Sequence, residues 1–247
     1  MKHIKLLAAM FILSFAVSAN AADFDALIKA NYAARGGKAI EKVKSISAVS
    51  EIETSMGNIA VKYFLELPKK FAIEVEQMGQ IMKFFNNGDK TAFLAGEQYE
   101  EIPENLEGTL LMQFPYNLFF RDNALVKPGF CTAENTTLEK ATLNEKEYQV
   151  IKVKINPFVE ILYYIDPTTK LEVAYGINLL KTGNDEFDQQ LEMYSNLKPV
   201  FEVKEWLEVD GVKFPKMVEI TVMGNNNKIH ITKVEINKPI EAKYFSK

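Results

Sequence analysis

The side chains that most often carry nucleophilic or metal chemistry are scarce in this chain. It has one cysteine, Cys131, and two histidines, His3 in the first few residues and His230 among alternating apolar residues near the end. Nucleophilic catalysis needs a nucleophile beside a general base, and structural zinc sites need several Cys or His ligands. The sequence therefore predicts a protein that is not an enzyme and that holds no cofactor and no metal.

The charge balance excludes a second class of function. The chain has 33 acidic and 29 basic residues, a formal net charge of −4, whereas nucleic-acid binding depends on clustered Lys and Arg. The sequence Arg35-Gly36-Gly37-Lys38 resembles a phosphate loop only superficially, because Ala39 stands where such a loop needs Ser or Thr and a helix precedes it. Neither nucleic acid nor nucleotide is an expected partner.

The N-terminus has the features of a secretory signal peptide. Lys2 and Lys5 precede an apolar run from Leu6 to Val17, and Ala19-Asn20-Ala21 supplies the small residues of a cleavage site. We expect residues 1–21 to be removed after Ala21, with Ala22 as the alternative. Residues 22–247 are then expected to form a single soluble, exported domain, held by its core alone because one cysteine allows no internal disulfide.

Short strands separated by turns dominate the mature chain. From Ser45 to Ala95 apolar and polar residues alternate with a period of two, which is typical of half-buried strands. Further strands are predicted at 137–143, 147–155, 159–165, 171–179, 199–208, 212–223 and 228–236. Asp210-Gly211 between two such runs is a strong hairpin signal. The sequence thus predicts a mainly β protein of about 11–12 strands, an estimate that follows from the spacing of the turns.

Three segments depart from this pattern. Residues 23–34 have helical spacing and are followed by Gly36-Gly37, which predicts an N-terminal helix. Residues 103–120 also have helical spacing, interrupted by Pro115, and predict a central helical lid. The acidic segment 183–196 is expected to be a loop with a short helix. Helices of this size can cover only part of so large a sheet, so we expect a half-open antiparallel β-barrel with an apolar interior.

The order of several motifs resembles that of a known family. Val209-Asp210-Gly211-Val212-x-Phe214-Pro215-x-x-x-Glu219, followed by Ile231-Thr232-x-Val234-x-Ile236-Asn237, Ile240 and Phe245, is similar to the C-terminal signature of the LolA-like outer-membrane lipoprotein-sorting proteins. Ala34-Arg35-Gly36-Gly37, Leu67-Pro68-x-Lys70 and Gly88-Asp89-Lys90 fit the same order. The resemblance implies a half-closed barrel with a helical lid that carries lipoproteins by their acyl chains across the periplasm.

The resemblance and the alternation together indicate which residues would bind such a ligand. The expected lining of an apolar cavity is Ile59, Val61, Tyr63, Leu65, Phe71, Ile73, Val75, Phe93, Leu110, Leu111, Phe114 and Trp206, although for any single one of them plain core is the favoured interpretation. The expected lid residues are Phe119, Phe120 and Arg121. Carriers of this family use an arginine in an early strand to hold the lid, whereas this chain has only Arg35 and Arg121.

The expected function is therefore that of a periplasmic lipid carrier. It would act as a monomer on lipoprotein acyl chains or another lipid, between an inner-membrane donor and an outer-membrane acceptor. The alternative is a lipid-sensing or structural envelope protein whose barrel is filled by its own side chains.

Overall fold

A computed structural model describes residues 24–54, 57–67, 70–77, 79–102, 132, 134–156, 159–180, 200–222 and 225–247. The predicted signal peptide, the predicted central lid and the acidic segment 183–196 lie outside these residues, so those three predictions stay predictions. No helix in the described ranges is long and apolar enough to cross a membrane.

The described strands form one antiparallel sheet. Its strands are β1 (Ser45–Thr54), β2 (Gly57–Glu66), β3 (Lys70–Gln77), β4 (Gln80–Asn86), β5 (Thr91–Ala95), β6 (Gln98–Ile102), β7 (Thr136–Leu143), β8 (Lys146–Asn156), β9 (Val159–Ile165), β10 (Glu172–Leu179), β11 (Val200–Val209), β12 (Val212–Val222) and β13 (Asn225–Ile236). Their order in the 13-stranded sheet is β6-β5-β4-β3-β2-β1-β13-β12-β11-β10-β9-β8-β7.

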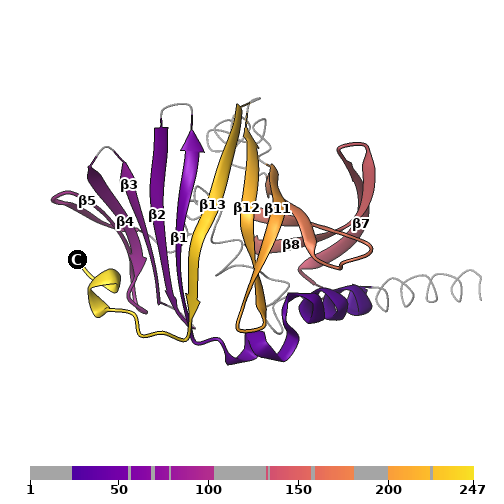
Figure 1. Ribbon diagram of the computed structural model, residues 1–247, viewed down its shortest axis with the longest axis horizontal. Coiled ribbons are helices and arrows are strands. Elements are labelled where there is room, and N and C mark those ends of the chain that lie inside the picture. Colours follow the sequence, from indigo (N-terminus) through magenta and orange to yellow (C-terminus); the bar gives the residue numbers. More distant parts are fainter. Residues whose placement is uncertain are drawn as a thin grey trace, which may run out of the picture.

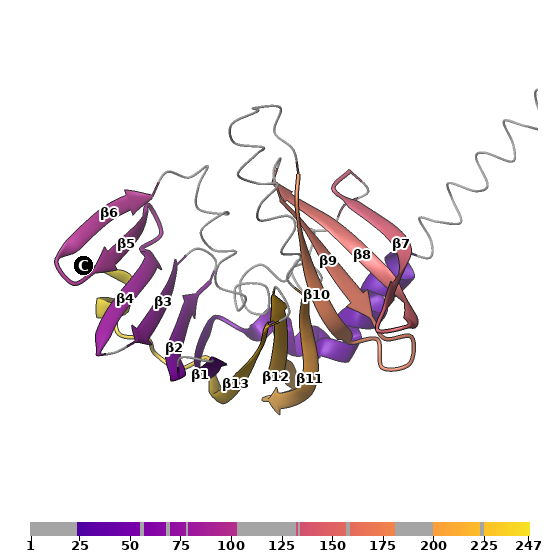
Figure 2. The same ribbon diagram turned by 90° about the horizontal axis from the view of Figure 1, so that it is seen from above.

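The sheet is curved and open. Seen from above it follows an arc with β6 at one end and β7 at the other (Figure 2). Its two halves meet where β1 pairs with β13, so the N-terminal and C-terminal strands form the middle of the sheet. This confirms the half-open antiparallel barrel. The strand that the sequence did not predict is β6, whose residues are mostly exposed and lack apolar alternation.

The Asp210-Gly211 hairpin has the predicted turn. Both residues have positive φ, 49° and 79°, as a type I′ turn between β11 and β12 requires. Asn144 and Glu145 adopt the same conformation between β7 and β8, with φ of 49° and 65°. That turn carries no glycine, and the sequence pattern did not single it out.

The N-terminal helix is also confirmed. Residues 24–35 are helical, and the helix ends at Gly36 and Gly37, whose φ values are 129° and 52°. The chain continues through a 3₁₀ helix, η1 (Gly37–Lys42), into β1. Figure 1 shows the helix running along the lower end of the sheet, on the side of β7 to β12. It therefore covers the lower end of the half of the sheet that contains β7 to β12.

Apolar side chains pack on both faces of the sheet. The large cluster lies on the concave face and joins residues of β1–β4 and β8–β13 with Leu27 of the helix. A smaller cluster on the convex face joins Ala72, Phe85 and Ala92 to Phe245 of the second 3₁₀ helix, η2 (Ala242–Phe245). Because successive residues of a strand face opposite sides, the two clusters use alternate residues of β3, β4 and β5.

Candidate functional site

The concave face carries the apolar residues that the sequence predicted as a lining. Val61 lies opposite Val75, and Tyr63 lies opposite Ile73. The row continues through Phe84 of β4, which pairs with Phe93 of β5 at 4.6 Å between ring centroids. Directly opposed residues of an antiparallel pair point to the same side. The predicted residues of β2, β3 and β5 therefore form one continuous surface.

These side chains are almost completely covered. Val61, Phe71 and Ile73 are each 1% exposed, and Ile59 and Phe93 are partly buried. They share one cluster with the opposite half of the sheet, which contributes Ile151, Val153, Ile161, Tyr163, Ile165, Tyr175, Phe201, Val218, Ile220, Ile229 and Ile231. The two halves of the arc thus form the walls of one apolar interior.

Other predicted site residues are placed differently or not described. Leu110, Leu111, Phe114, Phe119, Phe120 and Arg121 lie outside the described residues, so their roles in a roof or lid stay predictions. Trp206 of β11 is half-buried, and its ring lies beneath the guanidinium of Arg35 at 4.9 Å. Trp206 therefore adjoins a polar group of residues around Arg35.

That polar group fastens the N-terminal helix to the sheet. Arg35, at the end of the helix, donates from Nη1 to Glu172 Oε1 at 3.2 Å and to the Tyr175 hydroxyl at 3.3 Å. Arg35 is 2% exposed, and Glu172 and Tyr175 are 0% exposed. One turn earlier, Asn31 Nδ2 donates to the Lys170 carbonyl at 2.8 Å. We call these five residues the helix clip.

The charges of the helix clip stabilise each other in a dry environment. Burial alone would lower the pKa of the Arg35 guanidinium, but Glu172 and then Tyr175 outweigh it and hold that pKa above its ordinary value. Burial, followed by the Glu172 carboxylate, keeps the pKa of the Tyr175 hydroxyl well above its usual range. At physiological pH the Arg35 guanidinium therefore stays charged and the Tyr175 phenol stays neutral.

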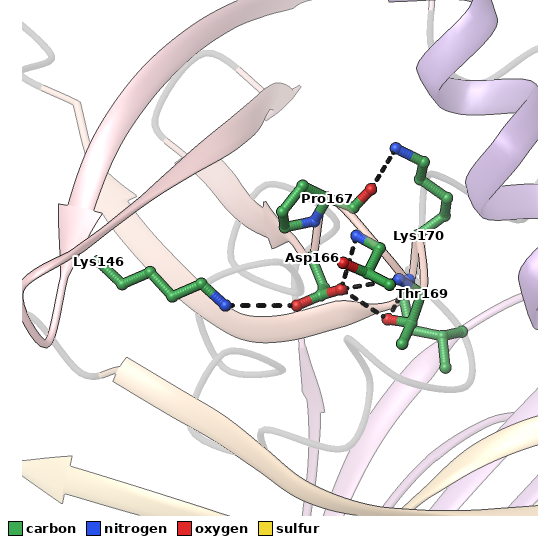
Figure 3. Close-up of polar contacts among 7 residues, drawn as sticks. Lys146, Asp166, Pro167, Thr169 and Lys170 are labelled. Atoms are coloured by element: carbon green, nitrogen blue, oxygen red, sulfur yellow. Dashed lines mark hydrogen bonds and ion pairs between the residues drawn. The ribbon is translucent and has the colours of Figure 1, made fainter.

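The turn between β9 and β10 presents the acceptor for Asn31, and Figure 3 shows the polar contacts within this turn. The Asp166 carboxylate accepts hydrogen bonds from the backbone N–H groups of Thr168 and Thr169, and it lies 3.6 Å from Lys146 Nζ. The Thr169 N–H is the main reason that the pKa of Asp166 lies below its ordinary value. Lys170 follows with a φ of 62°, and Glu172 then enters the sheet. The turn thus sets two members of the clip.

The helix end fits closely against the β11–β12 hairpin. A Cβ atom at Gly36 would overlap the Gly211 carbonyl oxygen, and the φ of 129° at Gly36 suits glycine alone. This close approach brings Gly36 and Gly211, which are far apart in sequence, into direct contact. The motifs quoted for the resemblance are two sides of one contact.

Among the described residues, His230 lies apart from the helix clip. His230 lies on the convex face, where its Nε2 is 3.4 Å from Glu53 Oε1 and its side chain is 38% exposed. No group of three or more His, Cys, Asp or Glu side chains in the described ranges is placed to hold a metal ion. What the site offers chemically is apolar contact, with one buried ion pair at its end.

Sequence reasoning missed the partners of Arg35. The strand over 171–179 was predicted, but nothing in its spacing distinguished Glu172 from the many other acidic residues. The usable signal is that Glu172 follows the turn that begins at Asp166-Pro167. A charged residue stands there at a position where the alternation of the strand calls for an apolar side chain.

Comparisons with known proteins find similar structures but no matching family. No family model matches the chain, and no curated protein matches it. A DUF1329 family protein from Desulfovibrio piger has a similar structure, with a TM-score of 0.54 and 9% identity over 89% of this chain and 97% of that one. A protein described as an outer membrane lipoprotein-sorting protein domain, from Vibrio parahaemolyticus, gives a TM-score of 0.52 and 10% identity over 87% and 95% of the two chains.

The chain has the fold of these two proteins. A LolA superfamily protein from Nitrosomonas europaea also matches, with a TM-score of 0.47 and 9% identity over 86% of this chain and 98% of that one. The Vibrio parahaemolyticus match confirms the resemblance to lipoprotein-sorting proteins at the level of the fold. The likeness extends to the fold, and what the concave face does belongs to the proposal below.

Proposed function

We propose that this protein is an exported carrier that holds the acyl chains of lipoproteins or other lipids against its concave face and moves them between the membranes of the cell envelope. The observation that carries the proposal is the continuous apolar surface of β2–β5, facing a second apolar wall in an open sheet. The shared fold with a lipoprotein-sorting domain supports it. Binding rather than catalysis is the proposed activity, with a monomer passing its load from an inner-membrane donor to an outer-membrane acceptor.

Burial of an acyl chain would supply the affinity. Each CH₂ removed from water contributes about 0.8 kcal/mol, so a chain of about 16 carbons gains on the order of 10 kcal/mol as an upper bound. A carrier must also release its load, so part of this gain has to be offset. Displacing the side chains that now cover Val61, Phe71 and Ile73 would offset part of it.

The burial of these same residues favours one alternative function. Lining residues that are 1% exposed are also expected in a barrel that is filled by its own side chains. Such a filled barrel suits a sensing or structural protein of the envelope. The two functions differ in whether an acyl chain can enter the interior. A lipid-binding measurement therefore separates them.

The experiment compares two isoleucines on opposite faces of the sheet. Ile59 of β2 packs against the concave cluster, whereas Ile81 of β4 is 53% exposed on the convex face. Protein purified from its exporting host is extracted for lipid mass spectrometry, and the delipidated protein is titrated with a fluorescent fatty acid. We expect co-purified lipid, and we expect Ile59→Asp to weaken binding at least tenfold while Ile81→Asp leaves it unchanged.

Either of two results would reject the carrier. One is the absence of both co-purified lipid and fatty-acid binding in the wild-type protein. The other is equal binding by the Ile59→Asp and Ile81→Asp variants, because binding would then not use the concave face.

A further inference from the structure

The C-terminal segment 237–247, called the strap below, leaves the sheet through a tight and well-bonded turn. Asn237 has a φ of 55° and donates from its backbone N–H to the Ser45 carbonyl at 2.9 Å. Its side-chain oxygen accepts from the Lys44 N–H at 2.7 Å, and Ser45 Oγ donates to the Lys238 carbonyl at 2.8 Å. The root of the strap is therefore fixed to the start of β1.

The strap then crosses the convex face of one wall only. Figure 1 shows it leaving β13 and ending beside β4 and β5. The Tyr244 ring stacks on Phe64 of β2 at 3.8 Å between centroids. Phe245 is 5% exposed and packs with Ala72, Phe85 and Ala92 of β3, β4 and β5. One short segment thus touches four consecutive strands from outside the arc.

The buried apolar residues on the convex face of these strands lie under the strap. Further along the same face, β2 and β3 carry Lys62, Glu74 and Glu76, which suit contact with water. Phe64, Ala72 and Phe85 would be an exposed apolar patch without the strap. The strap therefore covers an apolar patch that would otherwise face water.

A buried lysine fixes the far end of the strap. Lys83 of β4 donates from Nζ to the backbone carbonyls of Lys243 and Ser246 and lies over the Phe85 ring at 4.9 Å. Burying an ammonium group costs free energy unless its hydrogen bonds are satisfied, and here the strap supplies those bonds. The wall and the strap consequently stabilise each other through this single side chain.

We propose that the strap is a clamp that holds the β2–β5 wall in its curved position, so that its release lets this wall move away from the opposite one and widens the concave face. In the described sheet, the strands of this wall pair with each other through local hairpins and with the other strands through the β1–β2 pairing. The strap is hydrogen-bonded to β1 at one end and to β4 at the other. It therefore limits how far the strands of this wall can move away from the rest of the sheet. The opposite wall is attached to the N-terminal helix through the helix clip. The N-terminal helix and the C-terminal strap therefore each hold one wall.

Hydrogen–deuterium exchange of the full-length protein tests the clamp. Phe245→Asp removes the buried contact of the strap, and Lys83→Met removes its two hydrogen bonds while keeping an apolar stem. The control is Lys243→Ala, whose side chain is 64% exposed and pairs with Glu241 of the strap itself. We expect Phe245→Asp and Lys83→Met to raise exchange in β3 and β4 at least tenfold and to leave β9–β12 unchanged, with the control like wild type.

The clamp is refuted if exchange in β3 and β4 is unchanged, or if protection falls equally in both walls. Should Phe245→Asp fail to fold, Lys83→Met decides by the same comparison. The functional consequence rests on the proposed carrier: the same variants are expected to release a fluorescent fatty acid several times faster than the control. If the wild-type protein binds no fatty acid, the carrier proposal fails, while the exchange pattern still decides whether the strap is a clamp.

Discussion

The Arg35–Glu172 pair is the residue-scale feature that the structure adds to the sequence. Both side chains are almost fully buried, and removing one partner of such a pair leaves an uncompensated charge in a dry environment. We expect Arg35→Met and Glu172→Met each to lower the free energy of unfolding by about 3–5 kcal/mol. The double variant should cost clearly less than the sum of the two, as measured by chemical denaturation.

A pair on the surface provides the control for this cycle. Lys140 and Glu147 lie 2.8 Å apart, but their side chains are 69% and 63% exposed. Exposed pairs contribute little to stability, so Lys140→Met is expected to leave the unfolding midpoint unchanged. Strictly additive effects of the Arg35 and Glu172 substitutions would show that the buried pair is not coupled.

Asp166 predicts a pH dependence at the same scale. Its pKa is lowered below the ordinary 3.8 in the folded state, first by the Thr169 N–H, so its stabilising effect is complete above that value and is lost as the pH falls through the folded pKa. We expect Asp166→Asn to destabilise the protein at pH 7 (measured by urea denaturation). The gap to wild type should shrink steadily as the pH is lowered below the ordinary value. A gap that stays constant would mean that the carboxylate charge contributes nothing.

At the scale of elements, the contact between the N-terminal helix and the β11–β12 hairpin depends on Gly36. Alanine there meets both an unfavourable φ and the Gly211 carbonyl, so Gly36→Ala should destabilise by at least about 1 kcal/mol. Gly57 offers a matched control, because its φ is 115° but a Cβ would meet nothing within 4 Å. A thermal melt in which Gly57→Ala and Gly36→Ala lose the same stability would attribute the cost to backbone strain alone.

The elements also show what sequence reasoning reaches and where it stops. The alternation in β2 and β3 and the turn at Asp210-Gly211 are local signals, because side-chain direction and φ are decided within a few residues. The strand β6 was missed because its sequence Gln98-Tyr99-Glu100-Glu101-Ile102 lies at an edge and buries little. The helix clip was missed because it joins residues about 140 positions apart, and no spacing rule connects them.

The strap is a second feature whose packing could not be predicted from the sequence. Ile240 and Phe245 were recognised as parts of a C-terminal signature, yet their spacing gives no hint that they cover Ala72 and Phe85. An apolar residue on the convex face of a strand looks like an error in the alternation until its partner is known. The packing of a tail on a sheet is a tertiary fact, which the period of the strand does not encode.

For the whole molecule, the shared interior argues that the two walls fold as one unit. A single apolar cluster contains Val61 and Ile73 from one wall and Ile151 and Val153 from the other, so complete unfolding of either wall exposes apolar surface of its counterpart. The chain has one tryptophan, Trp206, whose fluorescence reports the contact with Arg35, whereas far-UV circular dichroism reports all strands. We expect the two signals to give the same unfolding midpoint in urea, as a cooperative single domain requires. If tryptophan fluorescence changes at a lower urea concentration than circular dichroism, the helix clip and its wall unfold separately, and the prediction of one domain over residues 22–247 is wrong.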